Sequence, residues 1–321
     1  MASQHSAEQA IRVGVVGLGV FGGYHARHYA ASPQAQLIAV VDADTARAAS
    51  LAAIYGATAL HDHRDLIGKV DAVSIAAPAT AHHAIARDLI DAGIHVLVEK
   101  PLATNAADAR DLVALADKHG VVLAAGHIER FSPATAALQE RIRKALRITA
   151  VRRSKWNGRS LDVDVVLDLM IHDIDLALTL AASPVVSVSA SGVVGASGGI
   201  DEAEAWLTFA SGAVATLSAS RIAAANERKL TVTEAGAIYA ADLGGPSLIV
   251  TARRVPGAVA QAIPLTPRDN LGAEIASFLD AVAGRGTLLV DGPAALAAVE
   301  VADRIRIAMA EVPAPNDLVS A

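Results

Sequence analysis

The chain contains no cysteine. Disulfide bonds, thiolate zinc sites and cysteine nucleophiles are therefore excluded, and any chemistry must come from His, Lys, carboxylates and hydroxyls. No apolar run approaches the roughly 20 residues needed to cross a bilayer. The polar opening MASQHSAEQA also lacks the basic start and apolar stretch of a secretory signal. We therefore expect a cytoplasmic protein without membrane association.

An excess of positive charge is also missing, because the formal net charge is -6. Nucleic-acid binding is not expected, since phosphate contacts require a basic surface. One local exception lies between residues 130 and 159, which contain nine Lys or Arg and a single acid, Glu140. Guanidinium groups suit bidentate contacts with a diphosphate. This excess favours a nucleotide-sugar substrate; solvated charges on a helix and on sheet edges are the alternative.

Hydrophobic patterning predicts two domains. Residues 1–125 alternate β-branched runs such as RVGVVG, LIAVVDA, AVSIAAP, HVLVEKP and VVLAAGH with Ala-rich amphipathic stretches, which predicts a doubly wound α/β (Rossmann) domain with a parallel sheet. Residues 126–321 begin with a helical stretch and continue with alternating segments such as VSVSASGVVG and EAWLTFASG. This predicts an α+β domain with a largely antiparallel sheet, closed by helices at 270–284 and 292–310.

A glycine-rich segment predicts a dinucleotide site. Gly17-Leu18-Gly19-Val20-Phe21-Gly22 follows a predicted strand and opens a predicted helix, so GxGxxG stands where it can bind a pyrophosphate. Asp42 ends the second strand, where a carboxylate accepts hydrogen bonds from ribose and repels a 2′-phosphate. NAD is therefore favoured over NADP, although Arg47 leaves NADP open and a helix N-cap is the alternative role for Asp42.

Two further segments complete the expected cofactor site. His82 follows the strand end at Ala77 and Pro78 and either faces the cofactor or lies on the surface of a helix. Glu99-Lys100-Pro101 follows the strand HVLV, at the carboxyl end of the parallel sheet, where such folds bind ligands. Pro101 restricts Lys100 to an extended backbone. The expected cofactor-binding residues are Gly17, Gly19, Val20, Phe21, Gly22, Asp42, Ala77, Pro78, His82, Glu99 and Lys100.

The apolar segment DVDVVLDLMIHDIDLALTL carries a polar stripe. Asp168, His172, Asp175 and Thr179 recur at spacings of four, three and four, which places them on one face of a helix. An Asp one turn before a His can orient the imidazole and stabilise its protonated form, as a general base requires. A structural Asp and His pair is the alternative. A zinc site lacks a convincing third ligand here, so no metal is expected.

These motifs together resemble the Gfo/Idh/MocA oxidoreductase family over residues 10 to 310. The resemblance implies an NAD-dependent enzyme whose catalytic residues are Lys100, Asp168 and His172, beside the nicotinamide. It also implies that the antiparallel sheet mediates assembly into dimers or tetramers. With the basic region included, the expected substrate-binding residues are Lys100, Arg130, Arg153, Arg159, Asp168 and His172.

GHIERFSPA and DVDVVLDLMIHDIDL are similar to the bacterial branch of this family that oxidises the 3-hydroxyl of UDP-N-acetylglucosamine. That resemblance implies a UDP-3-keto product, consumed by an aminotransferase on the way to a 2,3-diamino sugar of lipid A. The chain departs from the branch at Ser132 and Ser160, where Asn and Gly are usual, and from the family at Met170, where Gly is common.

The expected mechanism uses His172 to remove the hydroxyl proton, Lys100 to hydrogen-bond the developing alkoxide and Asp168 to orient the base, although Lys100 and His172 could exchange roles. A free polyol or aldose, or UDP-N-acetylglucosaminuronic acid, are alternative substrates, and a non-catalytic NAD-binding sensor is the alternative from another class. The remaining histidines considered, His25, His28, His61 and His63, are expected on the surface.

Overall fold

The computed structural model describes residues 10–158 and 160–310. The chain folds into two compact units that interleave along the sequence. Among the described residues, the first unit comprises residues 10–99, Asp111–Gly126 and Leu271–Gly292, and the second comprises Lys100–Arg110, His127–Asn270 and residues 293–310. The sequence predicted a single boundary between residues 125 and 126, whereas the units exchange segments at several points.

The first unit is built on a six-stranded parallel sheet with the order β3-β2-β1-β4-β5-β6. The order reverses at the β1 and β4 pair, which is the switch point where doubly wound folds bind their ligands. The predicted Rossmann architecture is confirmed. Its strands are β1 (Ile11–Val16), β2 (Ala35–Val41), β3 (Thr58–Leu60), β4 (Ala72–Ile75), β5 (His95–Glu99) and β6 (Leu123–Gly126).

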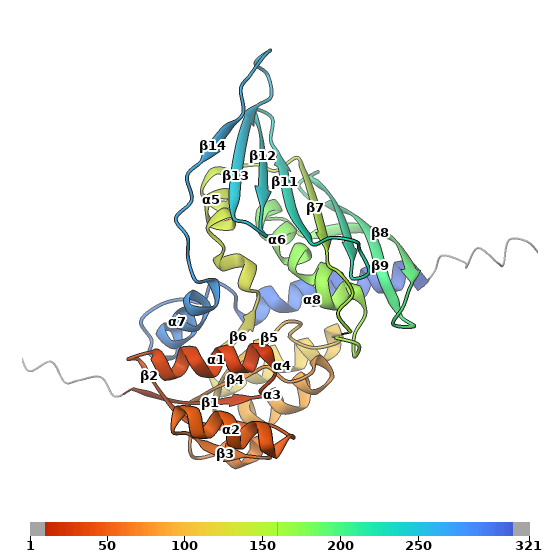
Figure 1. Cartoon of the computed structure of the whole chain (residues 1–321). Coiled ribbons are helices and arrows are strands. Elements are labelled where there is room, and N and C mark those ends of the chain that lie inside the picture. Colours follow the sequence, from red (N-terminus) through yellow and green to blue (C-terminus); the bar gives the residue numbers. More distant parts are fainter. Residues whose placement is uncertain (1–9, 159, 311–321) are drawn as a thin grey trace, which may run out of the picture. The chain divides into compact units, whose positions relative to one another are not determined.

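Amphipathic helices cover this sheet, drawn in red to yellow in Figure 1. Helix α1 (Val20–Ala31) packs on β1 and β2, α2 (Thr45–Tyr55) on β2 and β3, and α3 (His82–Asp91) on β4 and β5. The short 3-10 turns are η1 (His63–Leu66) and η2 (Ala79–Ala81). Helix α4 (Ala106–His119) contains one boundary between the units.

Helix α7 (Asn270–Val282) comes from far along the chain but belongs to the first unit from Leu271 onward. Phe278 and Leu279 are fully buried, and Asp280 accepts a hydrogen bond from the side chain of Gln34 at 3.0 Å. The Rossmann unit is therefore completed by a segment that follows the whole antiparallel sheet in sequence.

The second unit is built on an eight-stranded sheet with the order β14-β13-β12-β11-β7-β10-β9-β8. All neighbours are antiparallel except β7 and β10, which confirms a largely antiparallel sheet. Its strands are β7 (Arg147–Arg153), β8 (Val185–Val194), β9 (Ile200–Phe209), β10 (Val214–Ser220), β11 (Glu227–Thr233), β12 (Ala237–Asp242), β13 (Ser247–Ala252) and β14 (Gln261–Ile263).

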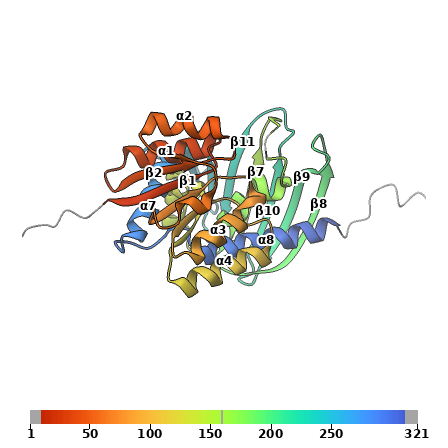
Figure 2. The same cartoon turned by 90° about the horizontal axis from the view of Figure 1, so that it is seen from below.

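Helices cover one face of that sheet. Along β9, Ala203, Ala205 and Leu207 are buried while Glu204 and Trp206 are exposed, as alternation on a half-covered sheet requires. The buried face packs against α5 (Pro133–Arg141) and α6 (Ile171–Ala181). Helix α8 (Gly292–Ala310) reaches β8, as Figure 2 shows. Two short turns, η3 (Ile128–Phe131) and the π turn η4 (Val166–Met170), precede α5 and α6. Within the described ranges, no helix is long and apolar enough to span a membrane.

Candidate active site

The glycine-rich loop has the backbone that a dinucleotide site requires. Gly17 has a positive φ of 82°, and a Cβ there would lie 2.5 Å from the backbone nitrogen of Ala77. A Cβ on Gly22 would overlap the carbonyl oxygen of Gly17, whereas one on Gly19 would meet no atom within 4 Å. Glycine is therefore needed at 17 and 22 for close packing, and the open space at Gly19 lets a ligand approach the backbone.

The amino terminus of α1 faces this loop. Helix α1 begins at Val20, and its N-cap is Gly19, which has no side chain that could cap the first amides. The first amides of a helix lack internal partners and attract anions. Val20 and Phe21 are 51% and 38% exposed, so apolar side chains flank the place where a pyrophosphate would bind.

Asp42 follows β2 and is tied to the glycine loop. Its carboxylate accepts hydrogen bonds from the amides of Leu18 at 2.7 Å and Asp44 at 2.8 Å. The helix-cap alternative is wrong, because Asp44 is the N-cap of α2. Arg47 pairs with both carboxylates at 3.3 Å. The acid at position 42 is thus held beside the loop, where a ribose carboxylate partner belongs.

The turn after β4 lies against the same loop. His82 is 1% exposed, and its Nε2 lies 2.9 Å from the carbonyl oxygen of Ala77. The surface alternative for His82 is therefore wrong. The His82 side chain braces the turn that contains Ala77 and Pro78, and the Ala77 backbone in turn contacts Gly17.

In the second unit, Lys100 and Asp168 form an ion pair. The Lys100 ammonium donates to the backbone oxygen of Asp168 at 2.7 Å and to its carboxylate at 3.3 Å. Both side chains are mostly buried, at 19% and 15% exposure. Lys100 precedes a cis peptide bond to Pro101. The structure therefore brings together two of the three residues expected to be catalytic.

His172 lies four residues after Asp168 in the same segment, but its side chain is not hydrogen-bonded to that of Asp168. Among the described residues, no hydrogen bond or ion pair joins the two side chains, and the buried Nδ1 of His172 has no partner. The π turn over residues 166–170 explains the difference. A π turn closes by hydrogen bonds from residue i to residue i+5. Two residues four apart, such as Asp168 and His172, therefore do not lie directly above one another as they would in an α-helix. The predicted orientation of His172 by Asp168 is not what the structure shows.

The surroundings of His172 keep its imidazole neutral. Burial lowers the pKa of His172 well below its ordinary value, and the positive charges of Arg152 and Lys100 lower it further. The ring of His127 lies edge-on at 6.3 Å. The sequence predicted a stabilised protonated form, which is wrong. A neutral imidazole can nevertheless accept a proton, so the general-base role remains chemically possible.

A buried charge network lies behind His172. Arg152 on β7 donates to Asp173 at 2.9 Å and to Glu129 at 2.8 Å, and all three side chains are nearly fully buried. The sequence reading counted Arg152 only as one of the nine basic residues between 130 and 159, and it did not single out Asp173 or Glu129. The alternation in RITAVRR, which places Arg152 with the buried Ile148 and Ala150, was the available signal. The network anchors the start of α6 to the sheet.

Arg221 holds the chain just before the π turn. It donates to Asp201 at 2.6 Å and to the backbone oxygens of Ser160 and Val163 at 2.9 and 2.8 Å, and lies 3.9 Å from the Asp168 carboxylate. Sequence reasoning missed this residue, because its partners lie between 20 and 61 positions before it in the chain. Its guanidinium fixes the approach to Asp168.

The expected substrate cations do not form one cluster. Arg130 is mostly buried and bonded to Asp175 at 2.8 Å. Arg153 is half-exposed, and alternation along β7 places it on the sheet face opposite to Arg152. Arg159 lies outside the described residues. Only Arg130 is thus near the elements that hold the catalytic candidates, since it bonds to α6.

The described residues include one group of His, Asp and Glu with metal-ligand spacing, and Asp168 and His172 are not among its members. The zinc alternative at this segment therefore gains no support. The glycine loop, the helix terminus and Asp42 fit a dinucleotide, and the Lys100 and His172 pair fits proton transfer at a hydroxyl.

Comparisons with known proteins agree with this geometry. Residues 11–127 match the model of an oxidoreductase family with an NAD-binding Rossmann fold, and residues 130–238 match the GFO/IDH/MocA C-terminal domain. The UDP-N-acetylglucosamine 3-dehydrogenase of Acidithiobacillus ferrooxidans is 37% identical over 306 residues, which cover 93% of this chain and 97% of that protein. Its solved structure superposes with a TM-score of 0.88 over 94% of this chain and 99% of the other.

More distant relatives share part of the chain or the fold alone. An inositol 2-dehydrogenase of Rubrobacter xylanophilus is 36% identical over 180 residues, covering 53% of this chain and 52% of its own. A levoglucosan dehydrogenase solved in complex with NADH has a TM-score of 0.85 at 20% identity, covering 94% of this chain and 98% of that chain. The inositol 2-dehydrogenase match thus covers about half of the chain, whereas the levoglucosan dehydrogenase shares the fold of both units.

Proposed function

Because the chain is an NAD-dependent oxidoreductase of the Gfo/Idh/MocA family, we propose that it oxidises the 3-hydroxyl of UDP-N-acetylglucosamine to the UDP-3-keto sugar. The observation that carries this proposal is the similarity to UDP-N-acetylglucosamine 3-dehydrogenase, which extends through 93% of this chain and 97% of that protein at 37% identity. The inositol 2-dehydrogenase match covers only about half of each chain.

In the proposed mechanism, His172 is the base that removes the hydroxyl proton. Its pKa is lowered by burial and by neighbouring positive charge, so the imidazole is neutral and able to accept a proton near neutral pH. Lys100 donates a hydrogen bond to the developing alkoxide. NAD, held by the Gly17–Gly22 loop and Asp42, would supply the redox chemistry by accepting the hydride from C3.

Asp168 acts through Lys100 in this mechanism. The Lys100 ammonium is bonded to the Asp168 carboxylate and backbone oxygen, which fixes the direction of the ammonium. A lysine side chain has many rotamers when nothing restrains it. The contacts with Asp168 restrict Lys100 before the substrate binds, so less side-chain entropy is lost when Lys100 contacts the substrate. The alternative, in which Lys100 is the base and His172 the hydrogen-bond donor, exchanges the two roles.

The cofactor would be held by the loop at Gly17 to Gly22, by Asp42, and by the turn at Ala77, Pro78 and His82, with Glu99 and Lys100 at the end of β5. For the substrate, Arg130, Arg153 and Arg159 remain the proposed partners of the diphosphate. Arg130 already neutralises Asp175, so it would have to contact a phosphate through donors that the carboxylate leaves available.

The open face of the eight-stranded sheet is the proposed surface for self-association into a dimer or tetramer. One row of paired residues crosses the sheet from β9 to β13. It consists of Trp206, Thr216, Thr149, Thr231, Ala240 and Ile249. Trp206 and Ile249 are each 42% exposed, and the row carries no charge, which suits an isologous contact. Light scattering should show an oligomer that Trp206→Glu dissociates; a monomeric wild type would refute this assembly.

The product is a ketone on a nucleotide-sugar, so a reaction that consumes ketones, such as an aminotransferase on the route to a 2,3-diamino sugar of lipid A, would follow it. A cytoplasmic location stays a prediction from the sequence.

The test is NADH formation, followed by absorbance, with purified protein, NAD and UDP-N-acetylglucosamine. A coupled aminotransferase with glutamate removes the ketone, because ketone formation is thermodynamically uphill. Sugar-dependent turnover that Lys100→Ala and His172→Asn abolish, with NAD affinity retained, supports the proposal. Turnover with an inositol or with UDP-N-acetylglucosaminuronic acid instead would replace the substrate. Tight NAD binding without turnover of any sugar would favour a non-catalytic sensor.

A further inference from the structure

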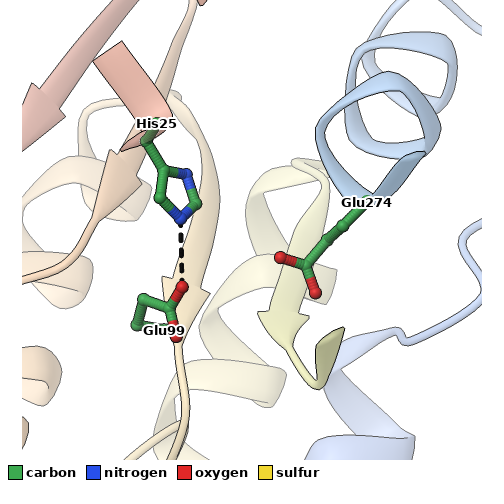
Figure 3. Close-up of side chains that lie close together, drawn as sticks. All are labelled: His25, Glu99 and Glu274. Carbon is green, nitrogen blue, oxygen red and sulfur yellow. Dashed lines mark hydrogen bonds and ion pairs between the residues drawn. The ribbon is translucent and has the colours of Figure 1, made fainter. Parts of the chain in front are cut away.

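A second cluster of ionisable groups lies in the first unit, apart from the residues used above for proton transfer. It joins His25 of α1, Glu99 at the end of β5 and Glu274 of α7 (Figure 3). One ligand atom from each residue lies within 4.8 Å of the others. His25 is fully buried and Glu274 is 3% exposed, so the prediction of a surface His25 is wrong.

Glu274 is the unusual member of the cluster. Both of its carboxylate oxygens are buried, and neither has a hydrogen-bond partner among the described residues. Figure 3 shows the carboxylate directed toward His25 and Glu99. A buried carboxylate with no partner is costly. Something that the protein itself does not provide, either a cation or a proton, must compensate it.

His25 is supported in the way that metal-bound histidines are. Its Nε2 lies 3.0 Å from the Glu99 carboxylate, and its Nδ1 lies 3.0 Å from the hydroxyl of Ser74. The Ser74 hydroxyl is in turn 2.7 Å from the hydroxyl of Tyr29. When Nδ1 donates to Ser74, the Nε2 lone pair is free to coordinate a cation, and the ring is held in place.

Gly126 packs closely against Glu99. Gly126 of β6 stands next to it, and a Cβ at that position would lie 2.9 Å from a Glu99 carboxylate oxygen and 3.0 Å from its Cα. Any other residue at position 126 would therefore crowd the cluster. Glycine at position 126 avoids that clash with Glu99.

We propose that His25, Glu99 and Glu274 bind one divalent transition-metal ion, with Zn²⁺ as the ion that best suits the donors. One imidazole nitrogen and two carboxylate oxygens form a three-ligand set that zinc uses with a water in the fourth position. Two carboxylates carry a charge of about -2, which a divalent cation neutralises.

The distances are compatible with this ion. Tetrahedral zinc with bonds of about 2.0 Å places its ligand atoms roughly 3.3 Å apart. The His25 and Glu99 atoms are already 3.0 Å apart. The Glu274 carboxylate needs to approach by roughly 1 to 1.5 Å to reach that spacing, which a rotation of its long side chain provides. The bound ion would link α1, β5 and α7, three elements that are far apart in the sequence.

A proton on Glu274 is the competing explanation. Burial, and then the charge of Glu99, raise the pKa of Glu274 well above its ordinary value, as they would for a carboxyl group that stays protonated. The two explanations differ in a measurable way. Only a cation site loses its ligand when Glu274 becomes an amide, whereas a protonated acid tolerates the amide, which has a similar shape and no charge.

The experiment uses the full chain without a histidine tag, dialysed against a chelator and then loaded with Zn²⁺. Bound metal is measured by elemental analysis, and Co²⁺ is used in parallel because its visible spectrum reports coordination by nitrogen and oxygen. Glu274→Gln is the test variant. Glu140→Gln is the matched control, since the Glu140 side chain is 75% exposed and its one ion pair within the described ranges is with Arg141.

The wild type and Glu140→Gln are expected to bind about one ion per chain. Glu274→Gln is expected to bind the ion at least roughly 100-fold more weakly, because mutation of even a hydrogen-bond partner of a metal ligand lowers metal affinity 10- to 100-fold. Equal binding by wild type and Glu274→Gln would overturn the proposal. So would a wild type that binds no metal and gives no Co²⁺ spectrum, an outcome that stands even if the variant fails to fold. Neither readout requires sugar turnover.

Discussion

Replacing Asp168 with Asn tests whether this acid acts through Lys100. The variant keeps the backbone oxygen that accepts from Lys100 at 2.7 Å and removes the charge of the carboxylate at 3.3 Å. A hydrogen bond to a charged group contributes about 1.5–3 kcal/mol. Because 3.3 Å is long for a charge-assisted bond, we expect a loss around or somewhat below the lower end of that range, about 1–2 kcal/mol.

That loss corresponds to a fall in kcat of roughly 5- to 30-fold. NAD affinity should not change, because Asp168 and the glycine loop belong to different compact units. The assay is initial-rate NADH formation with the coupled aminotransferase, together with an NAD titration by fluorescence. Asp162→Asn is the control, since Asp162 lies on the same segment and is exposed.

Two results would refute this reasoning. The first is an unchanged kcat in Asp168→Asn, which would mean that the ion pair is only structural. The second is a large displacement of the acidic limb of the pH–rate profile, because it would show that Asp168 sets the pKa of His172. The charges that shift this pKa are those of Arg152, Lys100, His127 and Arg228, and Asp168 is not among the principal causes.

Five further predictions follow from the same structure. The acidic limb of kcat/KM should lie below pH of about 6.5, because burial lowers the pKa of His172; a limb above neutrality would contradict a neutral buried base. The same depressed pKa means that the unfolded chain binds more protons than the folded one, so the free energy of unfolding, measured in urea, should fall as pH decreases below about 6.5. Gly22→Ala should lower that free energy by about 1–3 kcal/mol and weaken NAD binding, because the added Cβ overlaps the Gly17 carbonyl; unchanged melting and NAD titrations would argue against the tight loop. Ser160→Gly should raise thermal stability by about 0.5–1 kcal/mol, because Ser160 has a φ of 53°; a lower Tm would show that the serine side chain matters more than its backbone. Asp173→Asn should cost about 3–5 kcal/mol in urea denaturation, since it leaves a buried guanidinium with an incomplete partner set; a loss below about 1 kcal/mol would show that water reaches the network.

The parallel sheet and its helices were predictable because their signals are local. GxGxxG follows β1 and opens α1, and helix ends at Gly56 and Gly120 follow from their positive φ values of 66° and 64°. The expected helix at 292–310 is confirmed as α8. The short edge strands β3 and β14 carry weak periodicity. The longer interior strands β7 and β13 were not singled out either.

The candidate site was only partly predictable. Lys100, Asp168 and His172 were recognised as a group, yet their mutual contacts were not, since the π turn shifts the helical register. Arg152 with Asp173, and Arg221 with Asp201, are contacts between distant segments. Spacing within a segment carries no information about such pairs, which the packing of the sheet against α6 decides.

The place of α7 has a consequence for how the polypeptide acquires its structure during synthesis. When residues up to Gly126 have left the ribosome, every strand of the six-stranded sheet is present, but Leu271, Ile275 and Phe278, which are buried in that unit, are still unmade. The nascent Rossmann unit therefore cannot complete its apolar core, and leaves apolar surface exposed, until almost the whole chain has been translated. A fragment ending near residue 126 is thus not a transplantable module. A graft of this unit into another protein would need the 271–292 segment supplied with it.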